Sequence, residues 1–204
     1  MTGVVAVLAL IPVAYLLGTF PSAVLVARAG GHDILREGSG NPGASNVARI
    51  MGWKAGLVVM LADFAKGALA AGIGLALAGH AGAYLLGIAA VLGHMLPVTR
   101  RFKGGKGVAT GGGVLVVVFP LIVAALLVVW FLVARVLKRA SIASLLIAVA
   151  FPVAVWLTGG SGLDIAMTSA LAVVVILRHA SNLRRLVRGE EHTLGGGLAP
   201  EADG

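Results

Sequence analysis

The sequence predicts an all-α integral membrane protein with seven transmembrane helices, an N-terminus outside and a cytoplasmic C-terminus. Hydrophobic residues make up 59% of its 204 residues, charged residues make up 12%, and the mean hydropathy is +1.01. A soluble domain of this length could not bury so much apolar surface. In lipid, helices satisfy the backbone hydrogen bonds. The basic residues gather between the apolar runs, and their placement predicts the number and direction of the crossings.

Five of the seven spans follow directly from apolar runs in the sequence. We expect them over residues 3–27, 55–79, 83–98, 141–157 and 165–177. Pro12 interrupts the first run only mildly, and no Lys or Arg precedes this run, so it lacks the basic region of a cleaved signal peptide. The first span is therefore expected to be an uncleaved helix.

The apolar run over residues 111–134 predicts a short helical hairpin rather than one span. A single span would carry the basic residues 135–139 outside, against the cytoplasmic bias of Lys and Arg. A break near Pro120 gives two arms, each shorter than the roughly 20 residues of a normal span. The first arm can be lengthened if its helix begins near Lys106.

The basic residues support this topology. Of the 16 Lys and Arg residues, only Lys66 lies outside four basic clusters. The clusters are the opening loop (residues 28–54), the second loop (100–107), residues 135–139 and the tail (178–191). Seven crossings place all four on the cytoplasmic side. We expect one polytopic domain over residues 1–195 and a disordered tail over 196–204.

A polar, glycine-rich stretch from Gly38 to Arg49 interrupts the apolar pattern, with the sequence Gly-Ser-Gly-Asn-Pro-Gly-Ala-Ser-Asn-Val-Ala-Arg. Its three glycines and one proline exclude an ordinary helix or strand interior. We therefore expect a tight loop with exposed backbone N–H groups, several neutral hydrogen-bonding side chains and one fixed cation. Such a loop suits an anion, most simply a phosphate. The alternative is a flexible linker between helices.

The second loop and the tail also combine cations with polar or small residues. The second loop contains Arg100-Arg101-Phe-Lys103-Gly-Gly-Lys106-Gly107. Glycine between cations lets a ligand approach the backbone closely, which favours phosphate recognition. Anchoring to anionic lipid accounts for the tail arginines 184, 185 and 188.

Several other kinds of site are excluded by composition or spacing. There is no cysteine, so disulfides and thiol metal sites are excluded. Lys106 is followed by glycine rather than by the Ser or Thr of a P-loop. No two histidines have the spacing of a zinc helix, and no Gly-x-Ser-x-Gly elbow is present. No aspartate stands five positions after a histidine, so the His-x-x-x-x-Asp pair of the other large glycerolipid acyltransferase class is missing. We expect no metal and no cofactor.

Asp63 and Lys66 are ionisable residues inside the second predicted span. They stand three positions apart and so share one face of a helix. Ionisable side chains at membrane depth are costly and are normally paired or functional. The two interpretations are a self-neutralising pair that steadies helix packing and direct chemistry. We favour a supporting role beneath the glycine-rich loop.

Three motifs resemble those of the bacterial acyl-phosphate-dependent glycerol-3-phosphate acyltransferases, the PlsY family. The first is the stretch 38–49, extended by Asp63-Phe-Ala-Lys66-Gly67. The second is Gly93-His94-Met-Leu-Pro97, continued by Phe102-Lys-Gly-Gly-Lys-Gly-Val-Ala109. The third is Arg178-His179-Ala-Ser-Asn182-Leu-Arg184-Arg185-Leu186, followed by Gly189 and Glu191. The resemblance covers residues 3–195 in order. Two departures are Ser45, where threonine is common, and Glu190, where a smaller polar residue is common.

The resemblance implies transfer of a fatty acyl group from acyl-phosphate to the 1-hydroxyl of sn-glycerol 3-phosphate, which gives lysophosphatidic acid. This is the first step of bacterial phospholipid synthesis. Acyl-phosphate is already activated, so no acyl-enzyme is needed and the absence of a nucleophile motif is expected. The protein has to hold two phosphates, orient a hydroxyl and stabilise oxyanion charge.

The resemblance also implies the site residues. Catalytic roles are expected for Ser39, Lys106, His179 and Asn182. The expected substrate-binding set is Gly38, Ser39, Gly40, Asn41, Gly43, Ser45, Asn46, Arg49, Lys103, Gly104, Gly105, Lys106, Ser141, Ser144, His179 and Asn182. Structural support is expected from Asp63, Lys66, His94 and Glu191.

Within this set, the expected roles differ. Ser39, Arg49, His179 and Asn182 are expected to hold glycerol phosphate, and Asn41 and Ser45 to face the acyl-phosphate. Lys106 is expected between the two phosphates, and either Ser141 or Ser144 completes the site. His179 is a ligand first, and either it or a substrate phosphate is the general base.

Two hypotheses from other functional classes compete with the acyltransferase. A transporter or channel for a phosphorylated anion would use the same loops but needs a polar path through the membrane, which the spans hardly offer. A lipid-anchored scaffold leaves the glycine loops unexplained. We expect a multi-pass protein of the bacterial inner membrane whose site faces the cytoplasm. Its expected partners are both substrates, membrane lipid and a soluble acyl-phosphate-producing enzyme, with no nucleic acid.

Overall fold

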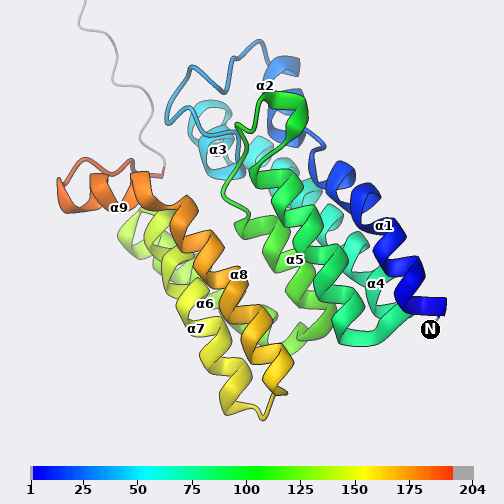
Figure 1. Ribbon diagram of the computed structural model, residues 1–204. Helices are drawn as coiled ribbons and strands as arrows, with labels where there is room; N and C mark the ends of the chain where they lie inside the picture. The colour runs from blue at the N-terminus through cyan, green and yellow to red at the C-terminus, as the bar shows by residue number, and fades with distance from the viewer. Residues whose placement is uncertain (1, 195–204) are drawn as a thin grey trace, which may run out of the picture.

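A computed structural model describes residues 2–194, and this part of the chain is helical with no β-strand (Figure 1). The predicted disorder of 196–204 and the end of the predicted domain at 195 lie outside the described residues. The elements are α1 (Thr2–Gly18), α2 (Ser22–Ala29), α3 (Ala44–Met51), α4 (Trp53–Met95), the short 3₁₀ helix η1 (Val98–Arg100), α5 (Val108–Val118), α6 (Pro120–Leu137), α7 (Ala140–Leu157), α8 (Gly162–Arg178) and α9 (Ala180–Val187).

Within residues 2–194, four helical segments are long and apolar enough to cross a membrane, and a fifth is added if the bent pair α8–α9 counts as one span. The four are Thr2–Ala29, Trp53–Arg100, α6 and α7. The 48-residue segment Trp53–Arg100 is too long for one crossing of a hydrocarbon core about 30 Å thick. This all-helical, multi-span architecture confirms the predicted fold class at that level.

Helix α4 is two antiparallel arms joined by a kink. Ala78 and Gly79 have non-helical backbone angles there, and the φ of Gly79 is +62°. After the kink the chain turns back on itself, because the backbones at Gly74 and Gly82 touch and Lys66 Nζ lies 2.9 Å from His94 Nδ1. The two arms correspond to the spans predicted over 55–79 and 83–98.

The predicted break near Pro120 is confirmed. Helix α5 ends at Val118, Phe119 is non-helical with φ −133°, and Pro120 is the first residue of α6. Proline suits a first helical position because it has no N–H to pair there. Lys106, two residues before α5, and Ser141, in the first turn of α7, line the same cavity, so the N-terminal ends of both helices lie close to it. Helices α5 and α6 therefore form a hairpin.

Two local expectations were wrong. The run 3–27 lies within one candidate span, Thr2–Ala29, but it is not one continuous helix. It breaks at residues 19–21, where Pro21 lacks an N–H and disfavours helical angles at the preceding residue. Helix α1 instead continues through Pro12. The stretch 38–49 is not a loop throughout, since α3 begins at Ala44, directly after the last of its glycines.

Contacts at one end of the molecule join all four basic clusters. Arg49 Nε donates to the Thr193 carbonyl at 3.2 Å, which ties the opening loop to the residues that directly follow the tail cluster. Arg178 donates to second-loop carbonyls at 3.0–3.3 Å, and the Leu194 N–H donates to the Lys138 carbonyl at 2.7 Å. The clusters that are separate in sequence thus form one surface.

Glycines let α4 pack backbone-to-backbone against α1 and α5, beside the group formed by α6, α7 and α8 (Figure 1). A Cβ at Gly113 of α5 would overlap the carbonyl of Phe64, and a Cβ at Gly18 of α1 would overlap the carbonyl of Ala90. Small residues at such contacts are the usual way to bring membrane helices close. This packing gives the site one rigid wall.

We predict that Gly113→Ala lowers the thermal midpoint of the protein in detergent, whereas Gly112→Ala does not. Each change adds one methyl group to α5. At Gly113 the methyl overlaps backbone, which costs about 1–3 kcal/mol, but at Gly112 it makes ordinary contact with the Phe64 ring at 3.5 Å. Equal midpoints for the two variants would contradict close α4–α5 packing.

Candidate active site

A cavity of about 410 Å³ lies where the basic clusters meet and extends between α4, α5 and the group α6–α8. Polar side chains line one end. These are Ser39, Asn41, Ser45, Asn46, Arg49, Asp63, His94, Lys106, Ser141, Ser144, His179, Asn182, Arg185, Glu191 and His192. The rest of the cavity is an apolar arm lined largely by α5, α6, α7 and α8. One continuous space therefore joins a cationic end to a hydrophobic arm.

Most of the predicted site residues line this cavity. Gly43 lines it as well as the polar side chains just named. Six predicted residues do not line it, namely Gly38, Gly40, Lys66, Lys103, Gly104 and Gly105. Lys103 is exposed.

Asn46 organises the opening loop from within. Its amide nitrogen donates to the carbonyls of Ile34 at 3.3 Å and Glu37 at 3.0 Å. Its amide oxygen accepts from the Ser39 N–H at 2.9 Å and from Arg49 Nη1 at 3.0 Å. An asparagine amide has two donor hydrogens and two acceptor lone pairs, so all are engaged. Asn46 holds the loop and Arg49 in place and has little left for a substrate.

Lys106 belongs to a partly buried hydrogen-bond chain. Lys106 Nζ donates to Asn182 Oδ1, Asn182 Nδ2 donates to Glu191 Oε1 at 2.5 Å, and Arg185 Nε donates to Glu191 Oε2 at 2.9 Å. Burial lowers the pKa of Lys106 to about 8, with neighbouring arginines adding to the effect and Glu191 opposing it. The cavity thus holds a cation that can lose its proton near physiological pH.

Glu191 remains a carboxylate in this chain. Burial alone would raise the pKa of Glu191, but hydrogen bonds, led by the one from Asn182, outweigh it and hold the pKa below its ordinary value. Glu191 therefore fixes the Asn182 amide, whose oxygen then faces Lys106. Glu191 therefore lies where it can support Asn182, and its role in the site stays a prediction.

His179 presents one ring nitrogen to the site. The ring is 2% exposed, and Nδ1 lies 2.8 Å from the Val175 carbonyl oxygen. A carbonyl can only accept, so Nδ1 carries the proton in this arrangement. In the neutral ring, Nε2 then keeps its lone pair. His179 can thereby accept a hydrogen bond from a hydroxyl in the cavity.

The glycines of the second loop serve packing rather than ligand approach. A Cβ on Gly104 or Gly105 would overlap His94, and the Gly105 N–H donates to the His94 carbonyl at 3.1 Å. The carbonyls of both glycines accept from the Arg178 guanidinium. Arg178 was not expected as a site residue, although it is the first residue of the third motif and that position was the available signal.

Asp63 and Lys66 form the self-neutralising pair that the sequence allowed, at 2.8 Å between Nζ and Oδ1. Their side chains are 3% and 4% exposed. Asp63 Oδ1 also accepts from Ser22 Oγ at 2.5 Å, and Lys66 lies 2.9 Å from His94 Nδ1. The pair therefore ties α2 to both arms of α4 directly beneath the polar end.

The two candidate serines differ in their hydrogen bonds. Ser144 Oγ donates to the Ala140 carbonyl at 2.8 Å and accepts from Trp130 Nε1 at 3.0 Å. Ser141 Oγ is buried and lies close enough to Glu191 for a hydrogen bond to help lower the pKa of that carboxyl, and it has no other hydrogen-bond partner within the described residues. The geometry therefore favours Ser141 as the serine available to a ligand. Trp130 was missed because a tryptophan in an apolar run looks like any lipid-facing residue.

Comparisons with known proteins show the family to which the chain belongs. The family model for glycerol-3-phosphate acyltransferase matches residues 8–189. The chain belongs to this family. A glycerol-3-phosphate acyltransferase of Bacillus cytotoxicus is 43% identical over 89% of this chain and 92% of that protein. The enzyme of Methylococcus capsulatus is 43% identical over 91% of this chain and 95% of that protein.

Solved structures show the same architecture. The crystal structure of PlsY (YgiH), an integral membrane glycerol 3-phosphate acyltransferase, in its glycerol 3-phosphate form has a TM-score of 0.88 with 36% identity, covering 93% of this chain and 96% of that chain. Its lysophosphatidic acid form has a TM-score of 0.86. The resemblance seen in the motifs is confirmed, and the chain is a multi-span membrane acyltransferase of glycerol 3-phosphate.

We predict that kcat/KM for glycerol 3-phosphate falls as pH rises through about 8. Above that pH the Lys106 ammonium becomes a neutral amine and no longer attracts phosphate, and kcat/KM reports the free enzyme. In Lys106→Arg the guanidinium stays charged, so this alkaline fall should disappear even if the rate is lower throughout. The same fall in both proteins, after correction for donor hydrolysis in enzyme-free blanks, would assign it to another group.

Proposed function

We propose that this acyltransferase takes its acyl group from acyl-phosphate and transfers it to the 1-hydroxyl of sn-glycerol 3-phosphate, releasing lysophosphatidic acid and phosphate. The observation that carries the proposal is the single cavity with a cationic end and an apolar arm. An acyl-phosphate has this division, with a dianionic head and a hydrocarbon chain. Relatives solved in glycerol 3-phosphate and lysophosphatidic acid forms support the acceptor and the product.

The polar end is suited to two phosphates. Lys106 lies centrally, because its ammonium donates to Asn182 of the tail. It is also close enough to Arg49 and Arg178 for their charges to lower its pKa. We assign Arg49, Ser39 and Asn182 to the glycerol phosphate, and Asn41, Ser45 and nearby loop backbone to the acyl-phosphate and its oxyanion. Ser141 completes the site. Cations fixed in place before the reaction stabilise developing charge without reorganisation.

Direct transfer follows from the donor's chemistry. The acceptor oxygen forms a bond to the acyl carbon, the bond from that carbon to the phosphate oxygen breaks, and the phosphate leaves. His179 Nε2 orients the hydroxyl by accepting its hydrogen bond. The hydroxyl proton goes to His179 or to a substrate phosphate, and the departing phosphate can carry it away.

The acyl chain is proposed to enter the arm sideways from the lipid. Two residues that line the cavity are also exposed on the outer surface of the helices, Leu61 of α4 at 56% and Leu127 of α6 at 41%. These side chains mark a lateral opening between α4 and α6. A donor held in the membrane could then slide its head group to Lys106 without leaving the lipid.

We further propose seven crossings with an external N-terminus, a bacterial inner-membrane location and a site facing the cytoplasm. The gathering of all four basic clusters at one end supports this orientation, since basic residues favour the cytoplasmic side. That face would receive acyl-phosphate from a soluble producer. An anion transporter is less well supported, because the cavity ends in the buried apolar residues Leu115, Val123 and Phe151.

Acyl transfer by the purified protein in lipid tests this proposal. Acyl-phosphate, acyl-CoA and acyl carrier protein thioester are offered in parallel with sn-glycerol 3-phosphate. We expect lysophosphatidic acid from acyl-phosphate alone. Equal or faster product formation from a thioester would contradict the donor assignment. No product from any donor, in folded protein, would contradict the activity and lead to flux assays for anion transport.

A further inference from the structure

The apolar arm of the cavity has a closed far end. Four buried side chains form it, one from each of α5 to α8: Leu115 of α5 is 8% exposed, Val123 of α6 is 9%, Phe151 of α7 is 7% and Thr168 of α8 is 2%. Each is the cavity-lining residue of its helix that lies farthest along the helix from the polar end. A chain lying along the arm would meet these residues last.

The arm has a definite length. On α7 the cavity runs from Ser141 at the polar end to Phe151, a separation of ten residues. At the rise of an α-helix this is about 15 Å. Phe151 is the largest of the four side chains at the far end, so its ring is the main obstacle to a longer chain.

Phe151 is held by aromatic contacts that reach the opposite end of the molecule. Its ring packs edge-on against Phe119 with centroids 6.2 Å apart. Phe119 is the non-helical residue between α5 and α6, and its ring packs against His80 at 6.1 Å. The column His80–Phe119–Phe151 therefore runs from the kink of α4 to the far end of the arm.

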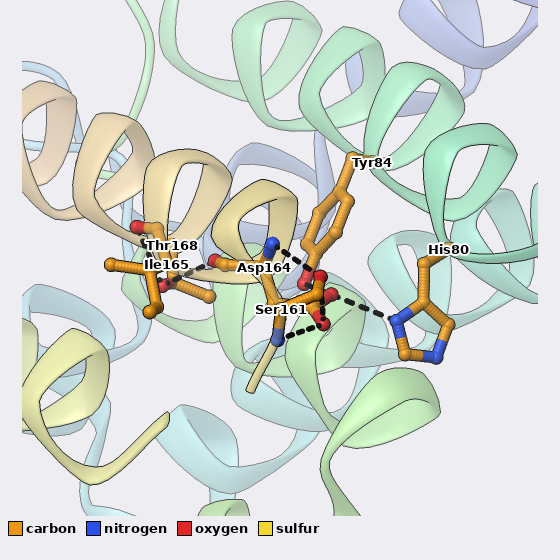
Figure 2. A network of polar contacts seen from close by, with 6 residues as sticks. All are labelled: His80, Tyr84, Ser161, Asp164, Ile165 and Thr168. Atoms are coloured by element: carbon orange, nitrogen blue, oxygen red, sulfur yellow. Dashed lines mark hydrogen bonds and ion pairs between the residues drawn. The ribbon is translucent and has the colours of Figure 1, made fainter. Parts of the chain in front are cut away.

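A polar network fixes His80. Figure 2 shows His80 and Tyr84 reaching from α4 to Asp164 near the start of α8. His80 Nδ1 and the Tyr84 hydroxyl each lie 2.8 Å from Asp164 Oδ1. Ser161 Oγ donates to Asp164 Oδ2 at 2.7 Å. The same two residues form the capping box that begins α8, in which the Ser161 N–H donates to Asp164 Oδ2 and the Asp164 N–H donates to Ser161 Oγ. Asp164 is 4% exposed, so the network is anchored by a buried carboxylate.

We propose that Phe151 is a specificity-determining residue that limits the length of the acyl chain, and that His80 and Asp164 position it through Phe119. The inference rests on the proposed acyl-phosphate reaction. The network is at the far end of the arm from Lys106 and has no part in the chemistry. Its contacts instead join α4, the α5–α6 break and α8 around the end of the arm.

Acyl-phosphates of a saturated even-carbon series, from ten to twenty carbons, test the inference through kcat/KM for each donor. In Phe151→Ala the arm is longer, so the ratio of kcat/KM for the longest donors to that for the shortest rises about tenfold, the scale on which hydrophobic pockets discriminate chain length. Thr168→Leu fills the same end and shifts the ratio the opposite way. Trp156→Ala, a lipid-facing change on α7, leaves it unchanged.

The outcomes separate the two proposals. A wild-type protein that makes no product from any acyl-phosphate overturns the proposed function. An active wild type whose chain-length profile is the same in Phe151→Ala and in Thr168→Leu overturns the inference, because the chain then leaves through the lateral opening at Leu61 and Leu127. If Phe151→Ala does not fold, the chain-length profile of Thr168→Leu alone tests the inference: a shift toward shorter donors supports it, and an unchanged profile overturns it.

The positioning role has its own readout. His80→Ala removes the ring against Phe119, so the profile should shift toward longer donors, in the same direction as in Phe151→Ala but by less. A merely structural role for His80 would lower activity toward all donors by the same factor. That result would remove the network from the proposal.

Discussion

The hydrogen-bond chain from Lys106 through Asn182 to Glu191 is the interaction on which the rest of the structure depends. A buried cation is costly unless it is paired and hydrogen-bonded. Its partners come from the tail, and Arg49 of the opening loop reaches that tail at Thr193. These contacts bring the second loop, the tail and the opening loop, which are distant in sequence, together at one end of the helices. The cationic end that could hold two phosphates exists only where they meet.

Different helices form the rigid wall and the apolar arm around this hydrogen-bond chain. Helix α4 packs rigidly against α1 and α5 through glycine contacts, and the Asp63–Lys66 pair holds its two arms to α2. Helix α6 is buried at only Val123 and Ala134, and with α7 and α8 it supplies much of the apolar arm. In the proposed reaction, the polar end holds the water-soluble acceptor while the apolar arm takes the hydrocarbon chain of the donor.

Charge and apolar runs were enough to predict an all-helical, multi-span fold, both arms of α4 and the break at Pro120, whereas the seven crossings and their orientation remain a proposal. Each of these follows from a strong local rule, namely burial in lipid, the placement of basic residues and the missing N–H of proline. Most of the predicted polar residues do line the cavity, although their roles remain proposals. Other features could not be predicted. In the sequence, a glycine beside a cation has the same pattern whether it admits a ligand or packs on His94. The hydrogen-bond partners of Arg178, Asn46 and Trp130 depend on tertiary contacts, which the sequence does not show.

We propose that acyl-phosphate and glycerol 3-phosphate meet around Lys106. The acyl group is then transferred directly from one to the other, without an acyl-enzyme. The most direct measurement is to mix the protein with acyl-phosphate labelled in its acyl chain, without glycerol 3-phosphate, and to denature it after various times. We expect no label bound covalently to the protein, and we expect label in lysophosphatidic acid once glycerol 3-phosphate is added. A hydroxylamine-sensitive acyl-protein that forms and decays as fast as turnover would contradict direct transfer.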